Sequence, residues 1–454
     1  MAPSAKLYNY EQSRSQSLKP FASDQLTEID SENNRSEDAK QLVGNALMHR
    51  ISEVDHEVCD AGDEDSFFVC DLGEIYRSFQ TWMSALSMVR PYYAVKCNND
   101  RKVIELLGSL GVNFDCASRN EIDMILNLGF LPERIVYANP CKNNSYIRHA
   151  DKVGVNLTTV DNCQELYKLK KFHPTCGILI RIATDDETAQ CRLSTKFGCS
   201  LDSALNEILP LASELDLNVK GVAFHIGSGA KDFNSIYKAI QESRAIFDKG
   251  IQDLGFSMQI LDIGGGFEAE TFEQSSFVVK ISLDKFFPEL YSKAHQIEFI
   301  AEPGRFFVSR AFTLATHVIA RRDISHSLKQ SSEIEAMIYI NDGVYGNLNC
   351  ILFDHQQPEP HVLTHKGIYR YGVYSDSDVD DEKGKFFSIW GPTCDGLDCV
   401  SNRSLLSEDI QVGDWVCFPN LGAYTSAATT SFNGLHTMSD TVYVCSEAVT
   451  GFFI

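Results

Sequence analysis

The chain has 454 residues, of which 44% are hydrophobic and 29 are glycines, so it is long enough for two folded domains with sizeable cores. Its formal net charge of −22 argues against nucleic acid or an anionic membrane as partner. No run approaches the roughly 20 apolar residues of a membrane span, and the start MAPSAKLYNYEQSRSQ lacks an apolar signal core, so we expect a cytoplasmic protein.

The beginning of the chain is polar. Residues 1–42 are rich in Ser, Asn, Asp, Glu and Gln and show little hydrophobic periodicity, which predicts a tail that is disordered or ordered only by contact. Residues 43–71 end in the strand-like run FFVCDL, and we expect this segment to contribute to a β domain. A second polar run, residues 375–385, predicts an exposed loop.

Residues 72–311 alternate between short β-rich runs and helical segments. Most of the eight β-rich runs are followed by a segment with helical periodicity, such as DRKVIELLGSL. Eight strands are more than an open doubly wound sheet usually holds, so the pattern predicts a (β/α)8 barrel. The runs are YYAVK (92–96), VNFDCA (112–117), RIVYA (134–138), LTTV (157–160), GILIRIA (177–183), GVAFHI (221–226), MQILDI (258–263) and EFIAE (298–302).

After residue 311 the helical segments give way to strand-like runs separated by turns, such as FTLATHVIA and KFFSIW. This pattern predicts an all-β domain over residues 312–454. The predicted fold class is therefore α/β plus all-β: a (β/α)8 TIM barrel with a second β-sheet or β-barrel domain.

A lysine closes the first predicted barrel strand. Barrel enzymes build their sites where the strands end, and Lys96 stands there in RPYYAVKCNND. Burial in an apolar strand would lower the pKa of this lysine and favour a neutral amine that could form a Schiff base with a carbonyl cofactor. The alternative is a lysine whose ammonium group reaches solvent at the strand end.

The seventh and eighth runs carry a candidate phosphate site. In LDIGGGF the glycines 264–266 let backbone N–H groups approach a phosphate, and Arg305 in AEPGRFF offers a forked, charged donor. A triple glycine alone is more often a tight loop, but phosphate sites recur after strands seven and eight of barrels. Glu302 could keep a pyridine nitrogen protonated or form a salt bridge with Arg305.

Two further segments offer candidate functional groups. His225 in HIGSG could stack on a flat cofactor while Ser228 binds its phosphate, although a lone histidine is more often structural. In WGPTCDGLDC, Cys394 could protonate a carbanion and Asp395 could receive a cationic group; a turn with a buried cysteine is the alternative. No histidine follows Cys394 and Cys399 at ligand spacing, so we predict no metal site.

Nine motifs, taken in order, resemble the eukaryotic ornithine decarboxylases from about residue 45 to the C-terminus. The resemblance implies an alanine-racemase-type barrel that binds pyridoxal 5′-phosphate (PLP), followed by a β domain. It also implies a homodimer with active sites shared across the interface. The motifs are YYAVKCN, FDCAS, HIGSG, DIGGGF, AEPGR, NDGVYG, FDH, WGPTCDGLD and GAYT.

The same resemblance implies a role for each matching cofactor residue. Lys96 would form the Schiff base with PLP, Glu302 would bind the pyridine nitrogen and His225 would stack on the ring. The phosphate contacts would come from Ser228, Gly265, Gly266, Arg305 and Tyr424, and supporting contacts from Asp115, Glu121 and Arg192.

On the substrate side, the resemblance implies that Cys394 and Asp395 come from the second subunit. Asp354 and Asp395 would bracket the distal ammonium of the substrate, Tyr345 would line the same end, and Cys394 would reprotonate the Cα. The implied reaction converts L-ornithine to putrescine and CO₂, the first step of polyamine biosynthesis. The sequence does not set the distance between the two carboxylates, so lysine remains an alternative substrate.

Two rival functions stay open. A catalytically inactive binding protein of the antizyme-inhibitor kind keeps the fold while losing cofactor residues, whereas this sequence retains Lys96, Glu302, Arg305, Cys394 and Asp395. The other rival is a related PLP enzyme: a lysine, arginine or diaminopimelate decarboxylase, or a racemase. The family also suggests an antizyme-like partner, bound through the helical surface around residues 143–173.

Overall fold

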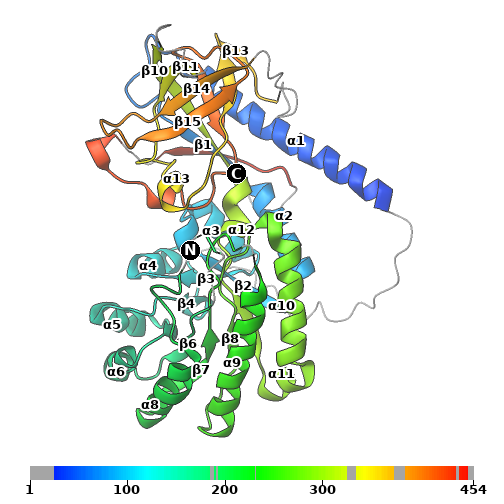
Figure 1. The fold of residues 1–454 in the computed structure, drawn as a ribbon, viewed down its shortest axis with the longest axis vertical. Helices are drawn as coiled ribbons and strands as arrows, with labels where there is room; N and C mark the ends of the chain where they lie inside the picture. Colours follow the sequence, from blue (N-terminus) through cyan, green and yellow to red (C-terminus); the bar gives the residue numbers. More distant parts are fainter. Residues whose placement is uncertain are drawn as a thin grey trace, which may run out of the picture.

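The fold is seen in a computed structural model, in which a barrel and a β sheet lie one above the other along the long axis (Figure 1). No described helix is long and apolar enough to cross a membrane. The structure describes residues 25–184, 189–190, 193–230, 232–324, 334–372, 384–435 and 439–447, with side chains from residue 37 onward.

The lower body is a closed barrel of parallel strands, eight in the described part of the chain. Its last strand, β9, returns to the first, β2, with Phe299 opposite Val89. The predicted (β/α)8 barrel is therefore confirmed. The strands are β2 (Val89–Ala94), β3 (Asn113–Cys116), β4 (Ile135–Tyr137), β5 (Leu157–Val160), β6 (Gly177–Arg181), β7 (Asn218–Ala223), β8 (Ile260–Asp262) and β9 (Glu298–Ala301).

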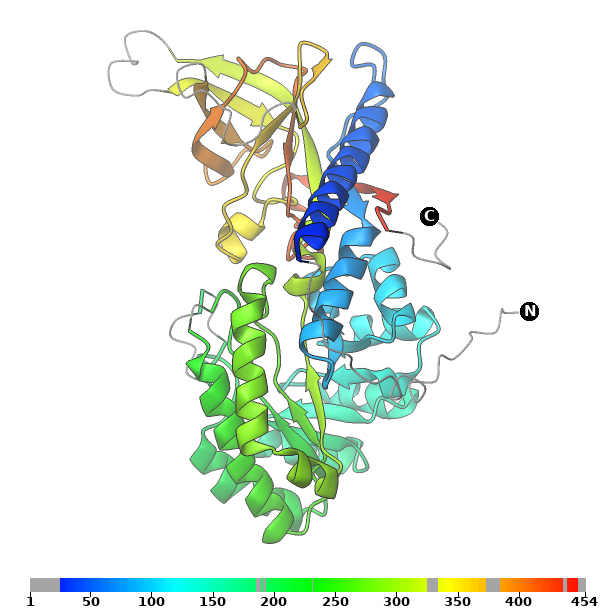
Figure 2. The same ribbon diagram turned by 90° about the vertical axis from the view of Figure 1, so that its right-hand side faces the viewer.

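Helices surround the barrel (Figure 2). Several begin at a polar cap: the side chains of Asp100, Ser118 and Asn162 each accept a hydrogen bond from a backbone N–H three residues later, at 3.1–3.3 Å. These caps set the residue at which the chain leaves a strand end and enters the next helix. The helices are α2 (Leu72–Ala85), α3 (Arg101–Ser109), α4 (Arg119–Asn127), α5 (Asn144–Val153), α6 (Cys163–Phe172), α7 (Leu201–Ser203), α8 (Leu209–Glu214), α9 (Asn234–Gln252), α10 (Phe272–Phe286), α11 (Glu289–His295) and α12 (Arg305–Val308).

Apolar side chains pack on both sides of the barrel wall. One large buried cluster joins the strands to the surrounding helices. A separate small cluster takes one residue from each of five strands, as expected for side chains that point toward the barrel axis: Tyr92, Val136, Leu179, Ala223 and Ile300. The barrel interior is therefore packed, which leaves the strand ends as the place for a site.

The upper body is a mixed sheet of nine strands among the described residues. The long strand β10 lies in the middle of the sheet, pairing with β1 and β16 in its first half and with β11 in its second half. The all-β prediction is confirmed. The strands are β1 (Phe67–Asp71), β10 (Phe312–Asp323), β11 (Ile334–Ile340), β12 (His361–His365), β13 (Ile368–Tyr369), β14 (Lys385–Trp390), β15 (Cys399–Leu406), β16 (Trp415–Phe418) and β17 (Asp440–Val444), with the short helix α13 (Cys350–Phe353) between β11 and β12.

A long helix, α1 (Gln25–Ser52), lies along the sheet (Figure 2). Of the two alternatives for residues 1–42, the disordered tail is therefore wrong for residues 25–42, which are helical, while residues 1–24 lie outside the described part. The polar composition hid a narrow apolar stripe at helical spacing. Its residue Leu47 is fully buried against Phe67 and Trp415 of the sheet, and the Tyr369 hydroxyl donates to the Gly44 carbonyl. The predicted loop at 375–385 falls mostly on residues that the structure does not describe.

Candidate active site

The candidate site lies where the carboxyl ends of the barrel strands meet the β domain. Two hydrogen bonds tie the bodies together there: Tyr424 N donates to the Cys97 carbonyl, and Asn98 Nδ2 donates to the Gly422 carbonyl, both at 2.8 Å. Tyr424 has a φ of +55°, a conformation that non-glycine residues rarely adopt and that recurs at functional sites. The β-domain loop is thus held against the turn that carries Lys96.

Lys96 stands on the short turn that follows β2. Its ammonium group forms an ion pair with the fully buried carboxylate of Asp115 on β3. Burial alone would lower the pKa of Lys96, but Asp115 and Glu302 together outweigh burial and raise it. The predicted lowering of the lysine pKa is therefore wrong, because the sequence did not show that two carboxyl groups face this amine.

Three carboxyl groups converge beneath Lys96: those of Asp115, Asp262 and Glu302, all at most 8% exposed. Burial, with Asp115 and Asp262 adding to it, raises the pKa of Glu302 well above its usual range. Burial also raises the pKa of Asp262 to about 7, although hydrogen bonds from Gly264 and Glu302 work against the shift. Burial and mutual repulsion thus shift both Glu302 and Asp262 toward their protonated forms, close to Lys96.

His225 follows β7 and faces the same space. Its Nδ1 accepts a hydrogen bond from Gly227 N at 3.0 Å, which leaves Nε2 to carry the ring proton. Burial, with Arg181 and Lys96 adding to it, lowers the pKa of the ring well below its usual value. The imidazole is therefore neutral and fixed in orientation, as a stacking partner for a flat ring requires.

The glycine run after β8 packs too tightly for any side chain. A Cβ at Gly265 would lie 2.7 Å from His225 Nε2 and 2.8 Å from the Glu302 carbonyl oxygen. Gly266 has a φ of +99° and would bring a Cβ to 2.5 Å from the Gly227 carbonyl oxygen. Glycine is required at both positions, and a backbone without side chains forms a cradle that a phosphate can approach.

Arg305, at the start of α12, stands beside this cradle. Its guanidinium donates to Ser228 Oγ at 3.3 Å, lies 5.2 Å from the Tyr424 ring centroid and is 3.4 Å from Glu268. It also forms a buried ion pair with Asp354, which follows α13 in the β domain. Among the described residues Arg305 pairs with Asp354 and Glu268 and not with Glu302, so the predicted alternative of a Glu302–Arg305 salt bridge is wrong.

Three predicted residues form a second cluster on the β domain. The Tyr345 hydroxyl donates to the Asp395 carboxylate, and the backbone N–H of the exposed Cys394 donates to Asn433 Oδ1 at 2.9 Å. Beside them is a cavity of about 180 Å³ whose walls include Tyr345 and Phe432. None of the described contacts of this cluster reaches Lys96 or Arg305, so one chain holds two separate parts of the predicted site.

Glu121 and Arg192 are the remaining predicted supporting residues. Glu121 caps α4: its side chain accepts from Ala117 N at 2.5 Å, while its own N–H donates to Ser118 Oγ. Its role in the structure is to start the helix that follows the strand of Asp115. Arg192 lies outside the described residues. Asp262 was missed as a site residue; the signal that could have found it is its place at the end of β8, two residues before the triple glycine.

The residues of the site fit PLP. The glycine cradle, Ser228 and Arg305 offer neutral and charged donors for a phosphate, and Lys96 offers an amine for the aldehyde. Buried oxygens of Asp115 and Asp262 lack a hydrogen-bond partner in the structure, as expected where a polar ring is to be received. The fold and the site together define a PLP-binding barrel protein.

Comparisons with known proteins agree with this description. Residues 72–309 match the family described as "Pyridoxal-dependent decarboxylase, pyridoxal binding domain". The ornithine decarboxylase of Candida albicans is 58% identical over 429 residues, which cover 91% of this chain and 90% of the relative. Antizyme inhibitor 2 of Xenopus laevis is 43% identical over 404 residues, which cover 87% of this chain and 84% of the relative. The crystal structure of the Paramecium bursaria Chlorella virus arginine decarboxylase has a TM-score of 0.75 at 34% identity, covering 84% of this chain and 96% of that chain.

The chain belongs to the pyridoxal-dependent decarboxylase family. Its cofactor is PLP, and both the predicted family and the predicted cofactor are confirmed.

Proposed function

We propose that this protein is a cytoplasmic ornithine decarboxylase that converts L-ornithine to putrescine and CO₂. The observation that carries the proposal is that Lys96, Asp115, Ser228 and Arg305 lie at the barrel mouth, in a chain whose relatives include the Candida albicans ornithine decarboxylase. PLP, when bound, supplies an electron sink for the pair of electrons left on the substrate carbon when CO₂ departs.

The residues around Lys96 prepare the site for this chemistry. Lys96 Nζ holds the cofactor and, once released, is held by Asp115. We assign the buried carboxyl group of Glu302 to the pyridine nitrogen, where it keeps a proton on that atom. His225 orients the pyridine ring of the cofactor by stacking on it, because the hydrogen bond from Gly227 N fixes the plane of the imidazole.

Substrate selection rests on acidic side chains. Asp354 lies at the mouth beside Arg305, and we assign it to the distal ammonium of ornithine together with Asp395. A site built to pair that ammonium rejects neutral amino acids, because a buried carboxylate would otherwise stay unpaired. When the Arg305 guanidinium binds phosphate, Asp354 is released from it to face the substrate.

The second cluster completes the site from another subunit. Cys394 and Asp395 lie on an exposed loop of the β domain, where Cys394 is accessible to act as the proton donor to the substrate carbon. Within one chain Cys394 lies apart from Lys96. A homodimer would bring the two parts together if the Cys394 loop of each subunit reached the barrel of its partner.

The test is complementation between two inactive variants, Lys96→Ala and Cys394→Ala. If each site uses Lys96 from one subunit and Cys394 from the other, random mixing puts half of the molecules in heterodimers with one intact site, which restores about a quarter of the wild-type release of CO₂ from L-ornithine. Mixtures that stay inactive would contradict the shared site, and a wild-type protein that binds PLP but releases no CO₂ would contradict the enzyme.

A second candidate function follows from one relative. Antizyme inhibitor 2 of Xenopus laevis matches nearly the whole chain, so identity alone does not separate an enzyme from a binding protein. The surface of α5 and α6 is the proposed docking place for an antizyme-like partner. Release of CO₂ from L-ornithine, L-lysine and L-arginine, measured side by side, decides between these functions and ranks the substrates.

A further inference from the structure

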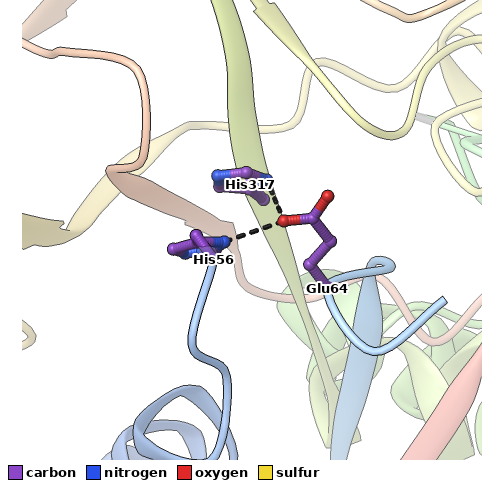
Figure 3. Close-up of side chains that lie close together, drawn as sticks. All are labelled: His56, Glu64 and His317. Carbon is purple, nitrogen blue, oxygen red and sulfur yellow. Dashed lines mark hydrogen bonds and ion pairs between the residues drawn. The ribbon is translucent and has the colours of Figure 1, made fainter. Parts of the chain in front are cut away.

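A second group of functional side chains lies in the β domain, outside the cofactor cluster. His56 and Glu64 come from the loop between α1 and β1, and His317 comes from the central strand β10 (Figure 3). His56 Nδ1 lies 2.8 Å from Glu64 Oε2, and His317 Nδ1 lies 3.8 Å from the same oxygen. One ligand atom of each residue lies within 4.8 Å of the others.

His317 is buried without the hydrogen bonds that a buried histidine normally makes. Its side chain is 7% exposed, and neither ring nitrogen has a hydrogen-bond partner. The ring contacts the imidazole of His56, at a centroid distance of 4.2 Å, and the indole of Trp415, at 5.3 Å. Two buried polar atoms without hydrogen bonds cost free energy of folding, so we expect this ring to bind a ligand that the described side chains do not supply.

The side chain of Asn341 joins the backbone of two of the three residues, His317 and Glu64. Asn341 accepts a hydrogen bond from His317 N at 2.8 Å through Oδ1, and donates from Nδ2 to the Glu64 carbonyl at 2.7 Å. This amide therefore holds the strand and the loop at a set distance. Such outer contacts are what keep ligand atoms in place at metal sites.

The chemistry of the three ligand atoms selects a class of ion. Two imidazole nitrogens and one carboxylate oxygen suit zinc and its neighbours among the transition metals, whereas calcium and magnesium prefer oxygen ligands. A tetrahedral zinc ion with ligands at about 2.0–2.1 Å places them about 3.3 Å from one another. The two distances to Glu64 Oε2, 2.8 and 3.8 Å, lie on either side of that value. The two imidazoles are stacked with 12° between their planes, so the exposed His56 ring must turn for both nitrogens to face one ion.

Access and charge also suit a metal ion. The side chains of His56 and Glu64 are 33% and 40% exposed, which leaves an entry path and room for water as the remaining ligand. The carboxylate of Glu64 is the one anionic ligand among the three and suits a divalent cation.

We propose that His56, Glu64 and His317 form a binding site for one zinc ion or a similar divalent transition metal. The ion joins the loop between α1 and β1 to the central strand of the sheet. Its role is structural: it fastens the N-terminal segment to the β domain, and it is independent of the proposed decarboxylation.

The test compares zinc binding by the full-length, PLP-loaded protein and three variants, by equilibrium dialysis with metal analysis after removal of any affinity tag. His56→Ala and Glu64→Gln each remove a ligand from an accessible position, so both variants are expected to fold. His49→Ala is the matched control, because this histidine lies on the same N-terminal segment, is 78% exposed and pairs only with Glu53 among the described contacts. We expect the wild type and His49→Ala to bind one more zinc ion per chain than the two ligand variants, whose affinity at this site falls at least about tenfold.

Cobalt gives a second readout. Trp415 lies against both imidazoles, so Co²⁺ bound there quenches its fluorescence, and the quenching is lost in His56→Ala and in the control Trp415→Phe. Equal zinc stoichiometry in the wild type and in both ligand variants would overturn the proposal. So would a wild type that takes up no zinc, since the three side chains would then be only a hydrogen-bonded His56–Glu64 pair with His317 stacked on His56.

Discussion

Replacing Gly265 by alanine tests the glycine cradle. The residue has an ordinary φ, so alanine meets no backbone penalty, and its Cβ meets only His225 Nε2 at 2.7 Å and the Glu302 carbonyl oxygen at 2.8 Å. Neither neighbour moves easily, because Gly227 N holds the His225 ring at 3.0 Å and Glu302 N bonds the Gly264 carbonyl at 2.7 Å. The added methyl group therefore pushes into the space that the cofactor is to occupy.

The size of the effect follows from the cost of adding a methyl group to a packed site, about 1–3 kcal/mol. If this cost falls on cofactor binding, the Kd for PLP rises about 5- to 150-fold, since each 1.4 kcal/mol is about a factor of ten. The assay titrates cofactor-free protein with PLP and follows the absorption band of the lysine-bound cofactor. Urea unfolding of the same cofactor-free samples measures how much of the cost falls on the fold instead.

The control is Gly396→Ala, because a Cβ at Gly396 meets no atom within 4 Å and the residue has an ordinary φ. We expect this variant to bind PLP as the wild type does. If Gly265→Ala keeps both the wild-type PLP affinity and the wild-type stability, the tight cradle is not a property of the protein in solution, and the assignment of the glycine run to the phosphate fails.

Three further predictions follow from the same contacts. Asp354→Asn raises the KM for L-ornithine about 10- to 100-fold, because it removes a carboxylate from the distal ammonium. The affinity for PLP does not fall, because Arg305 loses a partner that competes with the phosphate. A loss of PLP affinity would instead mean that Asp354 serves the cofactor and not the substrate. The pKa of Asp262, raised to about 7, lets the folded cofactor-free protein keep a proton that the unfolded chain releases near pH 4. The unfolding free energy therefore falls by at most about 4 kcal/mol between pH 4 and 7. Chemical denaturation at several pH values measures this fall, which should be smaller in Asp262→Asn. Leu47→Ala lowers the unfolding free energy by about 2–5 kcal/mol by opening a cavity between α1 and the sheet, with PLP affinity unchanged; an unchanged stability would mean that α1 does not pack there.

The barrel and the positions of its chemical residues were predictable because both follow from short-range patterns. Apolar β-rich runs define the strands, and a parallel barrel gathers all their carboxyl ends at one mouth, so Lys96, His225 and Glu302 had to lie close together. The second domain was predictable for the same reason, since strands separated by turns leave few other folds open.

What the sequence did not predict depends on contacts between distant segments. The raised pKa of Lys96 arises from carboxyl groups on other strands, and the Arg305–Asp354 ion pair joins the two domains. Helix α1 was missed because its apolar stripe is narrow and becomes meaningful only against the sheet that covers it. His56 and His317 have no recognisable spacing, because the whole barrel lies between them in the chain.

The pairing of β1 gives the order of synthesis a physical meaning. The barrel strands all lie between β1 and β10 in the chain, while β1 pairs with β10 on one edge and with β17 on the other. On the ribosome the barrel therefore has all its strands before either neighbour of β1 has emerged, and β1, whose five residues are all buried in the finished protein, waits unpaired. We expect this apolar strand to be the segment of the nascent chain most in need of a chaperone until β10, and finally β17, cover its edges.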